Sequence, residues 1–137
     1  MAVFIVDASA ALAWCFEDEA TEWSKELLIR VRRGDEIVVP AHWPAEVLNG
    51  LLFAARKKRI RPEQPELFWD ELTRLPIELE AALDADRSRT VLLLAEKHTL
   101  TVYDAAYLEL ARRRQLPLGT LDAELHNAGR AEGVRLL

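Results

Sequence analysis

The chain has 137 residues, which predicts a single domain over residues 1–137, because two halves would each be too small to bury a good core. Half of the residues are hydrophobic and 30% are charged, a balance that excludes a disordered tail or a collagen-like repeat. The net charge of −5 argues against non-specific coating of nucleic acid, but it leaves open an enzyme whose acidic residues hold metal ions.

Apolar runs in the sequence are too short for a membrane span, which needs about 20 apolar residues. Examples are residues 3–6 and 91–95. The N-terminus lacks a basic start and meets Asp7 after six residues, so it does not resemble a signal peptide. A single cysteine, Cys15, excludes an internal disulfide and a cysteine zinc cluster. We therefore expect a cytoplasmic protein.

Strands and helices are predicted to alternate along the chain. Residues 2–6 are short, β-branched and uninterrupted, which is typical of a strand buried on both faces. Proline, threonine and glycine then mark helix boundaries. The remaining elements are expected, in order, as helices at 8–14 and 20–33, a strand at 36–40, helices at 44–59 and 62–75, a brief strand at 77–79, helices at 84–98 and 101–115, a strand at 118–120, a helix at 123–131 and a last strand at 134–137. This alternation predicts a three-layer α/β/α sandwich with a central parallel sheet.

Four acidic residues follow the predicted strands or open the helices after them. Asp7 and Asp122 come directly after strands, while Glu46 and Asp104 lie in the first turns of helices. Ligands of parallel sheets bind beyond the carboxyl ends of the strands. We therefore expect these four acids to converge at one edge of the sheet.

Each acid also has a purely structural interpretation. Asp7 and Asp122 fit helix N-caps, residues 101–104 fit a capping box, and Glu46 suits a helix dipole. Taken together, however, a buried charge at Asp7 and several crowded carboxylates would be costly. A hard cation with oxygen ligands, such as magnesium or manganese, relieves that cost. Two such ions about 3.5–4 Å apart are a recurring device for phosphodiester cleavage.

The sequence around these acids resembles the PIN-domain family. The matching motifs, in the family's order, are Val6-Asp7-Ala8-Ser9, Pro44-Ala45-Glu46-Val47-Leu48-Asn49, Thr101-Val102-Tyr103-Asp104-Ala105-Ala106-Tyr107 and Thr120-Leu121-Asp122. The resemblance covers essentially the whole chain. The size and the third motif look most like the VapC toxins of bacterial and archaeal toxin–antitoxin pairs.

This resemblance implies a magnesium- or manganese-dependent endoribonuclease that cleaves RNA, is restrained by a cognate antitoxin and is commonly a homodimer. The implied catalytic acids are Asp7, Glu46, Asp104 and Asp122. Asp7, Asp104 and Asp122 are the preferred metal ligands, and Glu46 is either a further ligand or a general base. Supporting roles fall to Ser9, Asn49, Thr101 and Thr120. Glu124 is either a further acid of the site or a solvated helix residue.

The sequence gives weaker support for a functional role of its histidines and of its basic run. A lone histidine is usually a surface residue, which is the interpretation favoured for His42, His98 and His126. The densest basic run comprises Arg56, Lys57, Lys58 and Arg59, and it indicates either an RNA backbone contact or a solvated helix end.

Two rival functions remain at this stage. The first is a catalytically silent α/β binding module, in which the four acids are unrelated caps. The second is a receiver-type phospho-acceptor domain, which needs paired acids after the first strand and a lysine after a late strand. Val6 precedes Asp7, and residues 118–124 contain no lysine, so the receiver interpretation fits poorly.

Overall fold

Four parallel strands form the centre of the structure, a computed structural model that describes residues 1–137. The strands are β1 (Val3–Val6), β2 (Glu36–Val39), β3 (Ile77–Leu79) and β4 (Leu118–Gly119). Their order in the sheet is β3-β2-β1-β4. Since all pairings are parallel, every strand ends at the same edge of the sheet.

Strand β1 lies between β2 and β4 and is buried on both faces. Phe4, Ile5 and Val6 are each fully buried. Val3 pairs with Glu36 on one side, and Ile5 pairs with Leu118 on the other. This confirms the prediction of a doubly buried strand, and it places the residue after Val6 at the middle of the carboxyl edge.

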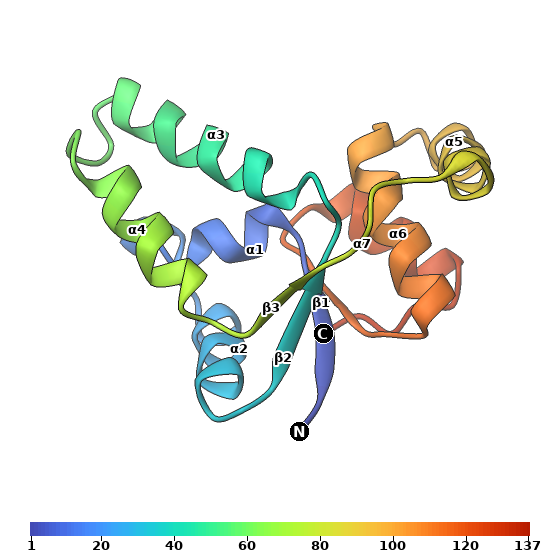
Figure 1. The fold of residues 1–137 in the computed structure, drawn as a ribbon, viewed down its shortest axis with the longest axis horizontal. Helices are drawn as coiled ribbons and strands as arrows, with labels where there is room; N and C mark the ends of the chain where they lie inside the picture. Colours follow the sequence, from blue (N-terminus) through green and yellow to red (C-terminus); the bar gives the residue numbers. More distant parts are fainter.

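Helices cover the two sides of this sheet, as Figure 1 shows. On one side lie α1 (Ala8–Ala13), α2 (Glu22–Arg32), α3 (Trp43–Arg56) and α4 (Gln64–Thr73). On the other lie α5 (Ala85–His98), α6 (Val102–Arg114) and α7 (Ala123–Ala131). A 3₁₀ turn at Glu17–Glu19, which the sequence did not predict, connects α1 to α2. The predicted three-layer α/β/α arrangement is therefore confirmed.

Helix α6 is the most deeply buried of the helices. Every residue from Ala105 to Ala111 is buried, and the helix packs against both α5 and α7. The Thr101 hydroxyl accepts a hydrogen bond from the Asp104 N–H at 3.1 Å, which caps the helix start. This cap fixes the first turn of α6, where Asp104 lies.

The last predicted strand, at 134–137, is wrong as a strand. Only an isolated parallel bridge forms there, between Leu118 and Leu136. Strand β4 has just two residues, so a neighbouring segment on its outer side can pair with it over only a very short length. The Leu118 N–H donates to the Arg135 carbonyl at 2.9 Å, and the Leu137 N–H donates to the Leu118 carbonyl at 3.0 Å. No helix in the structure combines the length and apolarity that crossing a bilayer would require.

Candidate active site

Asp7 lies at the carboxyl end of β1 and is only 4% exposed. Its carboxylate accepts hydrogen bonds from the hydroxyls of Ser9, at 2.7 Å, and Thr120, and from the Ala10 N–H at 3.0 Å. Burial raises the pKa of the Asp7 carboxyl above its ordinary value, and these three donors oppose that rise. The bond from Ala10 makes Asp7 the N-cap of α1, so the structural interpretation of this residue is confirmed.

The segment after β4 is held against Asp7 by the same hydroxyls. The Leu121 N–H donates to the Ser9 hydroxyl at 3.1 Å, and the Asp122 N–H donates to the Thr120 hydroxyl at 3.0 Å. The Asp122 carboxylate in turn caps α7 by accepting the Leu125 N–H at 3.0 Å. Strand order thus brings Asp7 and Asp122 together from opposite ends of the chain.

The electrostatic environment of Asp104 indicates that the four acids share one region. Its pKa is raised from 3.8 to about 6, first by burial and then by the charges of Asp122, Glu46 and Asp7. Coulomb repulsion weakens with distance, so three such contributions require three nearby carboxylates. The structure therefore places the four predicted acids within electrostatic reach of one another.

Glu46 is contacted by two side chains to which the sequence assigned no role. The Tyr107 hydroxyl donates to Glu46 Oε1 at 2.7 Å, and His42 Nε2 lies 3.2 Å from the same oxygen. Burial, followed by the Glu46 charge, raises the pKa of Tyr107 well above its ordinary value. His42 is not the free surface residue that the sequence favoured. The available signal was its spacing, because His42 and Glu46 are four residues apart, as helix neighbours are.

The other predicted site residues lie outside this hydrogen-bonded group. Asn49 and Glu124 are exposed, and neither is hydrogen-bonded or ion-paired to the four acids, so their roles stay predictions. The basic run begins at Arg56, about 15 Å along α3 from Glu46 at 1.5 Å per residue. Within it, Arg59 is already engaged, since it pairs with Asp18 at 3.0 Å and stacks over Phe16 at 4.7 Å.

The donor set at this sheet edge suits a hard divalent cation. All four acids offer carboxylate oxygens, the ligand type that magnesium and manganese prefer. As the side chains stand, no three acidic, histidine or cysteine residues surround a common point closely enough to hold an ion. The residues therefore fit such a cation by their chemistry, and binding one requires their side chains to close around it.

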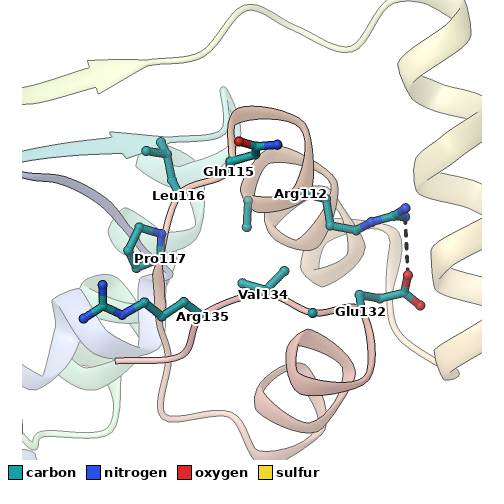
Figure 2. A pocket seen from close by; sticks show the side chains of 9 residues that line it. Arg112, Gln115, Leu116, Pro117, Glu132, Val134 and Arg135 are labelled. Carbon is teal, nitrogen blue, oxygen red and sulfur yellow. Dashed lines mark ion pairs between the residues drawn. The ribbon is translucent and has the colours of Figure 1, made fainter.

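A separate pocket lies at the opposite end of β4 and contains none of the four acids (Figure 2). Its volume is about 560 Å³, and it lies between the end of α6 and the segment after α7. Arg112 and Glu132 form an ion pair at its rim, with 3.4 Å between Nη1 and Oε1. Pro117 lines this pocket before β4 begins, whereas Asp122 follows the strand, so the pocket and the acids are separate features.

Comparison with known proteins identifies the relatives of this chain. The family model of the PIN domain matches residues 4–131. A curated relative, Ribonuclease VapC3 of Pyrobaculum aerophilum, is 31% identical over 121 residues, which are 88% of this chain and 90% of the relative.

Solved structures share the fold. The crystal structure of PAE2754 from Pyrobaculum aerophilum superposes with a TM-score of 0.73 at 24% identity, covering 99% of this chain and 92% of that one. VapBC2 from Rickettsia felis, crystallised with a DNA fragment from its promoter, gives 0.67 at 14% identity, covering 98% and 97%. With a family-model match over nearly its whole length, the chain belongs to the PIN domain family.

Proposed function

We propose that this chain is a metal-dependent endoribonuclease and the toxin of a toxin–antitoxin pair. The observation that carries the proposal is the convergence of Asp7, Glu46, Asp104 and Asp122 at the carboxyl edge of a PIN-domain sheet. The relative named Ribonuclease VapC3 supports RNA as the substrate. The likeness to the VapBC2 assembly supports an antitoxin as the partner. We also expect the free protein to be a homodimer.

Asp7, Asp104 and Asp122 are the proposed metal ligands. Magnesium or manganese, when bound, supplies an activated water and neutralises charge at the phosphate. Ser9 and Thr120 hold the Asp7 carboxylate in place, and Thr120 also orders the backbone at Asp122. Glu46 orients the attacking water or adds a further ligand. The bound RNA presents a phosphodiester to this edge of the sheet.

RNA cleavage by purified protein, freed of any antitoxin, tests the enzyme proposal. We expect cleavage of structured RNA with manganese or magnesium, and none with chelator or in Asp7→Asn or Asp104→Asn. Asp70→Asn, an exposed position on α4, is the matched control and should cleave like wild type. Full activity of Asp104→Asn would overturn the site assignment.

Growth and assembly measurements test the partner proposal. Expression of the chain alone should arrest growth of a suitable host, and Asp7→Ala should relieve the arrest at matched protein levels. Sedimentation of the free protein should give twice the monomer mass of 15.6 kDa. Equal tolerance of wild type and Asp7→Ala would remove the support for a toxin.

A catalytically silent binding module is the alternative function. One observation favours it, namely that Asp7 and Asp122 both serve as helix N-caps. Such a module would show no response to manganese that depends on these carboxylates, so a manganese titration separates the two functions.

A further inference from the structure

The Glu46 carboxylate is held through one oxygen only. The Tyr107 hydroxyl donates to Oε1 at 2.7 Å, and His42 Nε2 approaches the same atom at 3.2 Å. No protein donor reaches Oε2, so the two oxygens of this carboxylate are in different environments. Oε2 is therefore the oxygen that remains available to another molecule.

The surroundings of His42 determine which of its ring nitrogens carries the proton. Nε2 lies 3.1 Å from the Tyr103 carbonyl oxygen as well as 3.2 Å from Glu46 Oε1. The hydrogen bond of Nε2 goes to the Tyr103 carbonyl, an oxygen that only accepts, so Nε2 must be the protonated nitrogen. The rings of Tyr103 and Tyr107 pack edge-on against the imidazole, each with centroids 5.4 Å away, and keep its plane in this orientation.

The support for Glu46 also joins two layers of the fold. Tyr107 is fully buried in α6, one turn after Asp104, whereas Glu46 lies in the first turn of α3. These two helices lie on opposite sides of the sheet (Figure 1). The Tyr107–Glu46 bond therefore spans the edge where the acids meet. It fixes Glu46 relative to the helix that carries Asp104.

We infer that Tyr107 and His42 are positioning residues for Glu46. The Tyr107 hydroxyl holds Oε1 by a hydrogen bond, the His42 imidazole lies against the same oxygen, and Oε2 stays free for the reacting water or for the metal. This inference rests on the proposed nuclease function. A carboxylate anchored at one oxygen loses its rotational freedom and keeps its other oxygen in one place, which is the preorganisation that a general base or ligand needs. Mutation of a residue that orients a ligand or base typically lowers activity about 10- to 100-fold.

Steady-state cleavage of RNA by four variants tests the inference. Tyr107→Phe and His42→Leu should each lower kcat about 10- to 100-fold, with KM changed less than about threefold. His42→Gln should recover most of the loss, because its amide nitrogen restores a donor to the Tyr103 carbonyl and so keeps a side chain in place beside Glu46. Asp70→Asn, at an exposed position on α4 far from these contacts in the chain, is the control and should leave kcat unchanged. A full kcat in Tyr107→Phe, or a His42→Gln protein no better than His42→Leu, would overturn the positioning role.

A measurement without metal or substrate provides a second, independent test. In ¹⁵N NMR of the metal-free protein at about pH 8, His42 should carry its proton on Nε2 and none on Nδ1. The opposite tautomer would overturn the inference even if every variant folds poorly. A wild-type protein that is inert toward RNA with manganese would instead overturn the proposed function, and the positioning role with it. A wild type that cleaves, with variants that cleave equally well, overturns only the positioning role.

Discussion

Asp7 and Thr120 are 113 positions apart in the chain, and the Thr120 hydroxyl donates a buried hydrogen bond to the Asp7 carboxylate. The same hydroxyl accepts the N–H of Asp122 at 3.0 Å. One side chain therefore satisfies a buried charge at the end of β1 and orders the start of α7. A buried carboxylate that loses such a donor carries an uncompensated desolvation cost, so Thr120 should matter for stability as well as for the site.

Replacing Thr120 by valine tests this dual role. We expect Thr120→Val to lower the free energy of unfolding by about 1–3 kcal/mol, because the side chain keeps its volume while Asp7 loses a donor. Thr120→Ser should recover most of the loss. Thr90→Val, at an exposed position on α5, should change stability by less than about 0.5 kcal/mol. Urea unfolding measures all three, and equal stability of Thr120→Val and wild type would contradict the argument.

The order of elements was predictable from local patterns. An uninterrupted apolar run marked β1, and Pro44 and Thr101 marked the starts of α3 and α6. Strand neighbours were not predictable, because pairing depends on packing between distant segments. The segment 134–137 illustrates this, since its apolar pattern suits a strand but the two-residue β4 gives it a single bridge.

The candidate site was predictable in its acids but not in their supports. Acids that follow parallel strands must meet at one edge, so Asp7 and Asp122 could be placed together from the sequence. Helix capping does not exclude a site role, because a carboxylate can accept about four hydrogen bonds and Asp7 uses one of its three for the cap. The contact of Tyr107 with Glu46 spans 61 positions, and no local pattern reports a contact of that range.

The basic run divides into residues with different expected effects. Arg56 and Lys57 are exposed and make no ion pair, whereas Arg59 pairs with Asp18. If the run binds RNA, the Arg56→Ala, Lys57→Ala double variant should weaken binding. It should also flatten the plot of log affinity against log salt by about 0.7 for each phosphate that is no longer neutralised. Arg59→Ala should leave the slope unchanged and lower the melting temperature. An unchanged slope in the double variant would assign the run to a solvated helix end.

Manganese should stabilise the folded protein through the acids. A ligand at 100 times its dissociation constant adds about 2.7 kcal/mol to the stability of the state that binds it. We expect the melting temperature of wild type to rise with manganese and that of Asp104→Asn to rise much less. Asp70→Asn should respond like wild type. Equal shifts in wild type and Asp104→Asn would show that Asp104 is not an important ligand.

Without metal, the acids should make stability depend on pH in a defined direction. The folded-state pKa of Asp104, about 6, lies above its ordinary value of 3.8, so the folded protein binds this proton more readily than the unfolded chain. The destabilisation of the folded state by repulsion between the carboxylates is therefore fully present above pH 6. It decreases as the pH falls through that value. At lower pH the opposite effect takes over, because the ion-paired Glu80 and Glu132 have lowered pKa values and lose their partners when protonated.

Melting in chelator at about pH 7.5 and about pH 5.5 tests this expectation. Wild type should melt higher at the lower pH, because Asp104 becomes protonated there and its repulsion from Asp122 and Glu46 ends. Asp104→Asn should melt on the order of a few degrees higher than wild type at about pH 7.5, and the difference should narrow at about pH 5.5. Asp70→Asn, which removes an exposed charge, should keep the pH response of wild type. If the melting temperature of Asp104→Asn changes with pH as much as that of wild type, Asp104 is not the titrating group. The proposal that it belongs to a crowded acidic site would then be wrong.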